Sequence, residues 1–130
     1  MEGTFRVGDV LVVEPLPLRM VRRGDVIVFR PVKRDSLSGV TVHRVVRQTA
    51  DGFVTQGDAC LHPDAYRVQD AHFIGRVVWI QRGGRLYPVW GGWRGGVWLG
   101  LLSLWRRCLQ ISRLPYVQLR SSAVVRYFWR

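Results

Sequence analysis

His43 and two aspartates that follow it are the side chains best suited to chemistry in this sequence. His43 stands in the valine-rich run 40–46, and Asp58 and Asp64 belong to the polar stretch 55–64. A carboxylate beside a histidine holds the imidazole in one tautomer and stabilises its protonated form, so that the ring can act as a general base. The alternatives are a packed or surface histidine and aspartates that serve only as turn formers. His43 with Asp58 or Asp64 is therefore a candidate acid–base pair.

Residues typical of metal sites and of lysine-based catalysis are sparse. Cys60, His62 and the nearby aspartates are plausible ligand types, but the chain has no CxxC or HxxxH spacing to support a metal site. Lys33 is the only lysine, which nearly excludes a mechanism that needs a catalytic lysine. The sequence predicts neither a metal nor another cofactor.

Size and composition indicate one ordinary globular domain. The chain has 130 residues, 48% apolar and 22% charged, which argues for a real core and against disorder. Two cysteines, Cys60 and Cys108, are too few for a disulfide framework. Collagen, mucin, coiled-coil and disulfide mini-protein classes are excluded.

The charge is strongly positive, with 20 basic against 9 acidic residues and a net charge of +11. Such a surface attracts phosphates, whether of nucleic acid or of anionic lipid, although a GC-rich genome would also explain the preference for arginine. A basic nucleic-acid-binding β module is one alternative, testable by salt-dependent retention on DNA. The basic residues are scattered and no RNP-like aromatic strand occurs, which disfavours nucleic acid as the partner.

Short β-branched runs separated by turns dominate the first 80 residues. The expected strands are 9–13, 25–29, 40–46, 52–56 and 73–80. The first two each follow a glycine and begin with an aspartate, and the polar segment 60–70 is expected to be a loop. This pattern predicts a mostly β fold, a small antiparallel sheet or barrel.

The composition changes after Gly83-Gly84. Residues 86–105 contain one charged residue, Arg94, but also a proline and five glycines. Only residues 97–105 are cleanly apolar, which is too short to cross a bilayer. Tryptophans interleaved with arginine are typical of a membrane interface. We therefore divide the chain into a β core, 1–82, and a Trp/Arg-rich segment, 83–130. That segment either lies on a membrane, packs on the core as a helix, or spans.

Five short motifs occur in order along residues 1 to about 80. They are the segment 1–13, the Gly24-Asp25 strand, the run 42–46, Gly57-Asp58-Ala59 with Asp64, and Ile74-Gly75-Arg76-Val77. In this order they resemble the conserved boxes of the signal peptidase I family. The first is similar to its Ser-Met-x-Pro-Thr segment with a following Gly-Asp strand. The run 42–46 is similar to the His-Arg-Val box of the archaeal, endoplasmic-reticulum and sporulation-type branch.

The resemblance implies a β-rich serine endopeptidase on the outer face of a membrane, cutting leader peptides from exported proteins. It makes His43 the general base and Asp64 the orienting acid. Asp58 is placed in a supporting turn, although the two carboxylates could exchange roles. The partners it implies are a preprotein or peptide substrate and an anionic membrane surface. The motif residues carried over as structural are Gly8, Asp9, Gly24, Asp25, Arg44, Gly57 and Gly75.

The nucleophile is the main departure from the family pattern. The family serine would stand directly before Met1, and no serine occurs until Ser36. Thr4 matches a family threonine that is not the nucleophile, and Gly3 replaces the usual proline. From the sequence as given we expect no N-terminal anchor like that of the family, no other targeting segment and no activity. Two hypotheses remain: a true start upstream of Met1, or a catalytically dead protein that keeps the scaffold and binds peptides or membrane.

Overall fold

One mostly antiparallel β-sheet is the main architectural element of the described chain. The computed structural model describes residues 4–31, 39–97, 100–101, 104 and 124–125. Its strands are β1 (Val10–Glu14), β2 (Val26–Phe29), β3 (Thr41–Thr49), β4 (Gly52–Gln56), β5 (Arg67–Val68), β6 (Phe73–Arg82), β7 (Arg85–Pro88) and β8 (Val124–Val125). Two short 3-10 helices, Leu18–Met20 and Asp70–His72, connect β1 to β2 and β5 to β6. The expectation of a mostly β fold is confirmed.

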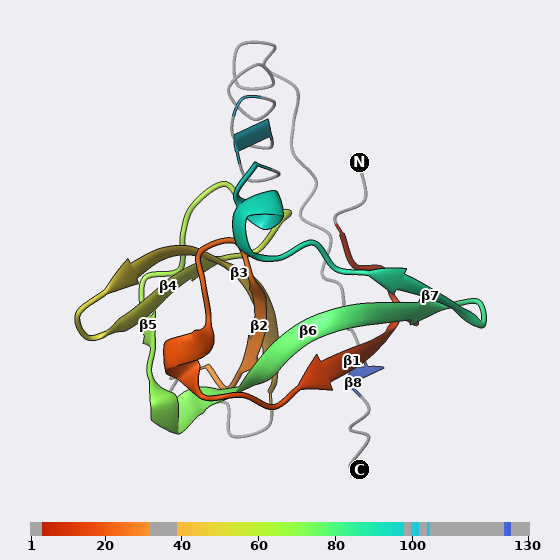
Figure 1. Cartoon of the computed structure of the whole chain (residues 1–130), viewed down its shortest axis with the longest axis horizontal. Coiled ribbons are helices and arrows are strands. Elements are labelled where there is room, and N and C mark those ends of the chain that lie inside the picture. Colours follow the sequence, from red (N-terminus) through yellow and green to blue (C-terminus); the bar gives the residue numbers. More distant parts are fainter. Residues whose placement is uncertain (1–3, 32–38, 98–99, 102–103, 105–123, 126–130) are drawn as a thin grey trace.

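The strands form an open sheet in the order β5-β4-β3-β2-β6-β1-β8, with β7 paired to β6 as a hairpin (Figure 1). All described pairs are antiparallel except β1 with β8. The long, curved β6 joins the two halves, because it pairs with β2 through its first residues and with β1 through its later ones. The two end strands in this order, β5 and β8, do not pair, so the sheet is not closed into a barrel.

The central strand β2 separates two apolar cores. All four of its residues are buried, and alternate side chains point to opposite faces. Ile27 and Phe29 join one core with Val45 and Phe53 of β3 and β4. On the other face, Val26 and Val28 join Leu11, Val77 and Ile80 of β1 and β6. A strand covered on both faces reads as a continuous apolar run, as residues 26–29 do.

The two Gly-Asp motifs form the same kind of turn. In each sequence Arg-x-Gly-Asp, 6–9 and 22–25, the aspartate N–H donates to the arginine carbonyl at 3.1 Å, and an aspartate carboxylate oxygen accepts from the arginine N–H at 2.8–2.9 Å. Gly8 and Gly24 have φ of 91° and 95°, as the third residue of a type II turn requires. The repeat in the sequence therefore places β1 and β2 by one local device.

Three strands were not predicted from the sequence: β5, β7 and the two-residue β8, which pairs with β1. The expectation that 60–70 is entirely loop is wrong, because β5 pairs with β4 through Val68 and Arg67. β7 lies beyond residue 82 yet pairs with β6 around Gly83-Gly84, where φ is 55° and 77°. A two-residue strand and a fully exposed four-residue strand have too little alternation to be recognised without their partners.

A helix begins at residue 92, and its first turn packs on the 22–25 turn. The Gly92 N–H donates to Asp25 Oδ1 at 2.6 Å, and a Cβ on Gly95 would come within 2.2 Å of the Gly24 carbonyl oxygen. In the described part of the chain, no helix has the length and hydropathy needed to cross a membrane. Lys33, Cys108 and most of the segment 98–130 lie outside the described residues.

We predict that Asp9→Asn destabilises the fold in a pH-dependent way. Asp9 is buried, and its carboxylate accepts two hydrogen bonds from Arg82 at 2.7 and 2.6 Å. The Arg82 side chain holds the pKa of Asp9 below its usual value of 3.8, against the opposing effect of burial. This stabilisation is fully present above that usual pKa and disappears as the pH falls through the lower folded-state pKa.

Denaturant unfolding should therefore show a loss of about 1–2 kcal/mol at pH 7. The difference between Asp9→Asn and the parent should shrink in acid. An equal loss at all pH values would contradict the ion pair as its source.

Candidate functional site

His43 projects from β3 beside the buried strand β2. It lies opposite Ile27 in the β2–β3 register, and its ring meets Phe29 edge to face, with centroids 6.1 Å apart. The side chain is 22% exposed. Phe29 is fully buried, so it gives the imidazole a fixed wall on one side while another part of the ring reaches solvent.

Asp64 is the carboxylate that contacts the imidazole. Its Oδ2 lies 2.6 Å from Nδ1 of His43, and the Asp64 side chain is 14% exposed. Thr55 of β4 anchors this aspartate twice: its hydroxyl donates to Oδ2 at 2.5 Å, and its carbonyl accepts from the Asp64 N–H at 2.8 Å. A carboxylate fixed in this way holds the proton on Nδ1 and leaves Nε2 to accept one.

Gly57 lies against the Nε2 side of the His43 ring. A Cβ on Gly57 would stand 3.0 Å from Nε2 of His43, tighter than most real contacts. Within the described residues no hydrogen bond occupies Nε2. The nitrogen that would take a proton is therefore the one left open.

Tyr66 and a shallow cavity complete the surroundings of Asp64. The Tyr66 ring packs edge to face on Phe29 at 5.9 Å. Burial, followed by the charge of Asp64, raises the pKa of Tyr66 to about 12, so the phenol stays neutral. A cavity of about 320 Å³ lies between β3, β4 and the segment 63–67, with Asp64 in its wall. Tyr66 also lines this cavity and His43 does not, so it lies on the Asp64 side of the pair.

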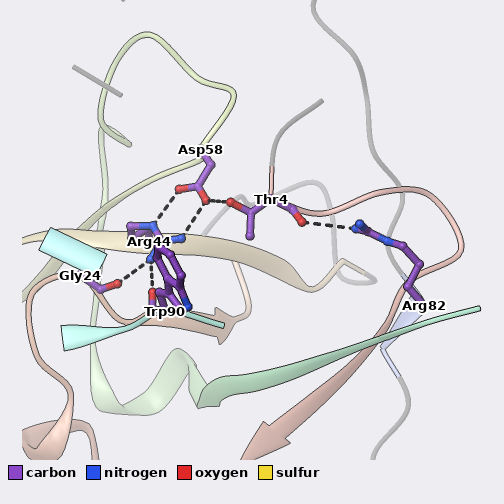
Figure 2. Close-up of polar contacts among 6 residues, drawn as sticks. All are labelled: Thr4, Gly24, Arg44, Asp58, Arg82 and Trp90. Atoms are coloured by element: carbon purple, nitrogen blue, oxygen red, sulfur yellow. Dashed lines mark hydrogen bonds and ion pairs between the residues drawn. The ribbon is translucent and has the colours of Figure 1, made fainter. Parts of the chain in front are cut away.

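Asp58 serves a different, structural role. Its two carboxylate oxygens accept from Nε and Nη2 of Arg44, both at 2.9 Å, and Oδ2 also accepts from the Thr4 hydroxyl (Figure 2). The side chains of Arg44 and Asp58 are 1% and 7% exposed. This ion pair is therefore shielded from water, and its two parallel hydrogen bonds fix the relative orientation of the two side chains.

The third guanidinium nitrogen of Arg44, Nη1, contacts two further segments of the chain. Nη1 donates to the Gly24 carbonyl at 2.8 Å and to the Trp90 carbonyl at 2.6 Å (Figure 2). We call Arg44, Asp58, Thr4 and the carbonyls of Gly24 and Trp90 the Arg44 network. It joins the N-terminal segment, the turn before β2, the strand that carries His43 and the chain leading into the helix.

The other motif residues lie in the scaffold. Gly8-Asp9 and Gly24-Asp25 form the two turns, and Asp25 holds the helix start. Gly75 allows β1 to approach β6, because a Cβ there would meet Val13 and the Glu14 carbonyl at 2.6 and 2.7 Å. In the described part of the chain, none of these residues forms a hydrogen bond or ion pair with the His43 side chain, so they position the site rather than take part in it.

Three contributors were not identified from the sequence: Thr55, Phe29 and Tyr66. Each looks like an ordinary strand or loop residue. Only the pairing of β2, β3, β4 and β5 brings them around His43. Thr55 follows Phe53 and Val54 in a run of three buried β4 residues, so a polar residue in this apolar run was a weak signal. Buried hydroxyls need a hydrogen-bond partner, and here that partner is Asp64.

Metal-ligating side chains are not gathered in the described residues, where no group of three His, Cys, Asp or Glu could hold an ion. Comparisons with known protein families, with curated proteins and with solved structures found no match. The geometry of the His43–Asp64 pair is therefore the basis for any functional conclusion.

We predict that substitutions of Asp58 and Asp64 differ in how much they lower the free energy of unfolding. Asp58→Asn should lower the free energy of unfolding by about 3–5 kcal/mol, because it leaves the buried Arg44 without its counter-charge. Asp64→Asn should cost much less, because the amide oxygen can still accept from Thr55. Urea unfolding of both variants checks this, and equal losses would contradict the division of roles.

Proposed function

We propose that this chain is the β core of a signal-peptidase-like serine endopeptidase that cleaves leader peptides from exported polypeptides. The observation that carries the proposal is the 2.6 Å contact between Asp64 and Nδ1 of His43, with Nε2 left open beside Gly57. To activate a hydroxyl as a nucleophile, a site needs an imidazole with one accessible nitrogen and a carboxylate that orients the ring. The same residues are the ones that the family resemblance assigns as base and acid.

The position of Thr4 is compatible with the proposed serine, which would stand directly before Met1. Thr4 is bonded to Asp58, which follows Gly57, the residue that lies against Nε2. A residue directly before Met1 is four positions from Thr4, a reach of at most about 14 Å. The segment is thus anchored close to the base, and a serine at its head could reach Nε2.

The reaction then follows from the positions of these groups. Nε2 of His43 takes the serine proton as the serine oxygen bonds to the scissile carbonyl carbon. Asp64 stabilises the imidazolium that forms, and the imidazolium gives its proton to the departing amine as the peptide C–N bond breaks. Water repeats the sequence on the acyl-enzyme and regenerates the serine. No metal or other cofactor is required.

We predict that cleavage depends on a serine before Met1 and on His43. A chain with a leading segment ending in serine should cut a synthetic leader peptide, and the matched chain ending in alanine should not. In the serine chain, His43→Ala should abolish cleavage without unfolding the protein. Asp64→Asn should reduce kcat by several orders of magnitude through loss of tautomer control.

Two outcomes would overturn this assignment. Retained cleavage in folded His43→Ala would remove the histidine from the mechanism. Loss of cleavage in Asp58→Asn at a temperature where it is folded, with full activity in Asp64→Asn, would reverse the carboxylates. The intact mass of the protein from its own cells, compared with 15.0 kDa, separates an upstream start from a catalytically dead scaffold.

A second candidate function, attachment to an anionic membrane surface, is favoured by exposed apolar side chains around the helix. The large apolar residues left in solvent there are Trp90, Trp93, Val97, Leu101 and Leu104, each more than half exposed. Spacings of three and four residues place such side chains along one helix face. Arg94 lies over the Trp93 ring at 5.5 Å. Aromatic and basic side chains together suit the headgroup region of a bilayer. On the proposed function, this surface lies on the extracytoplasmic side.

We predict that the double variant Trp93→Ala/Leu101→Ala binds anionic vesicles more weakly than the parent. Sedimentation with phosphatidylglycerol-rich vesicles measures the binding, and neutral phosphatidylcholine vesicles separate charge from apolar insertion. Val7→Ala, which changes an exposed apolar side chain on the first turn, is the matched control. Unchanged binding in the double variant would contradict a membrane-facing helix.

A further inference from the structure

The Cys60 thiol lies next to the proposed base. Cys60 ends the turn 57–60, in which its N–H donates to the Gly57 carbonyl at 2.8 Å. Its own carbonyl accepts from Nε2 of the Gln56 side chain at 2.8 Å. The residue is partly exposed, and its sulfur is not in a disulfide. The turn thus holds a free thiol at a fixed place that reagents can reach.

The sulfur and the open nitrogen of His43 converge on one point. A Cβ built on Gly57 would be 2.8 Å from Cys60 Sγ and 3.0 Å from His43 Nε2. Both atoms therefore border the small space that the missing Gly57 side chain leaves. Thiol, imidazole and carboxylate are then in sequence: Cys60 faces the Nε2 side, and Asp64 binds Nδ1 at 2.6 Å.

Neighbouring hydroxyls do not fill this role. The Thr4 hydroxyl donates to Asp58, and the Thr55 hydroxyl donates to Asp64. The Tyr66 phenol, with its pKa raised to about 12 by burial, stays protonated. Among the described residues, Cys60 is therefore the nucleophilic side chain next to Nε2. Its sulfur forms no hydrogen bond or disulfide with another described residue.

We propose that Cys60 is a nucleophile activated by the His43–Asp64 pair, and that it accepts acyl groups from activated esters and thioesters. The inference rests on the same base as the proposed function but needs no serine. A nucleophile, a base and a third group that orients the base are the general signature of covalent catalysis. The thiolate is the reactive form of cysteine, and proton transfer to a neutral Nε2 generates it.

Acyl transfer begins with deprotonation of the Cys60 thiol. The S–H proton moves to Nε2 of His43, and the thiolate sulfur bonds to the carbonyl carbon of the ester. The C–O bond of the ester then breaks, its oxygen leaves with the bonding pair, and a thioester on Cys60 remains. With p-nitrophenyl acetate the leaving group departs as p-nitrophenolate, and the imidazolium releases its proton to solvent.

The test measures Cys60 reactivity directly in the full chain. In a Cys108→Ser background Cys60 is the only cysteine, so intact mass gives its rate of alkylation by iodoacetamide. At neutral pH the folded parent should react about tenfold or more faster than both His43→Gln and the guanidinium-unfolded parent, because the base takes the thiol proton as the sulfur attacks. His62→Gln, which changes an exposed histidine two residues away, is the matched control and should react like the parent.

A second measurement follows acyl transfer. The parent should release p-nitrophenolate in a burst of one equivalent and carry one acetyl group on the peptide that contains Cys60. Cys60→Ala should show neither the burst nor the acetyl group, and Gly57→Ala should slow both reactions by displacing the thiol or the imidazole. Equal alkylation rates in the parent and His43→Gln, or no acetyl group on Cys60, would overturn the proposal.

An assay of leader-peptide cleavage by the serine-extended chain tests the proposed function independently of Cys60 reactivity. If the serine-extended chain cleaves with His43 dependence while Cys60 reacts like an unfolded thiol, the peptidase assignment stands and the Cys60 proposal fails. If Cys60 shows His43-dependent reactivity and the serine-extended chain cleaves nothing, the reverse holds.

Discussion

The buried ion pair between Arg44 and Asp58 is the constraint on which the rest of the structure depends. A guanidinium with 1% exposure is stable only where its donors are satisfied, and here they bind Asp58 and the carbonyls of Gly24 and Trp90. Those partners come from separate segments, and Thr4 adds a further one. Removing either charge would leave the other buried without a counter-charge, which is strongly destabilising. The network therefore holds these segments together.

This network also decides which carboxylate serves the histidine. Asp58 uses both oxygens on Arg44 and Thr4, which leaves none directed at the imidazole. Asp64, held by Thr55 and slightly more exposed, is the one that reaches Nδ1. Because Gly57 directly precedes Asp58, the ion pair also fixes the open space beside Nε2. One buried charge pair thus fixes the chain on both sides of this space: His43 directly precedes Arg44, and Gly57 directly precedes Asp58.

The scaffold repeats a local device and gives each copy a different long-range task. Both Arg-x-Gly-Asp turns use a positive-φ glycine and an aspartate that accepts the arginine N–H. The other oxygen of Asp9 binds Arg82 at the end of β6, whereas that of Asp25 binds the Gly92 N–H where the helix begins. Each turn therefore precedes a strand and also connects that strand to a segment distant in the sequence.

The sequence by itself determined the β class, the strands around 9–13, 25–29, 40–46, 52–56 and 73–80, and His43 with a nearby aspartate as the candidate pair. These features depend on local alternation, turn glycines and residue type, which neighbours in the chain specify. Only the tertiary structure decided that Asp64 contacts His43, that Arg44 and Asp58 form a buried pair, that β5 and β7 join the sheet, and that Cys60 stands beside Nε2. The physical reason is that each of those outcomes depends on partners far apart in sequence. Competition between chemically identical carboxylates is resolved by burial and geometry, which one-dimensional spacing does not contain.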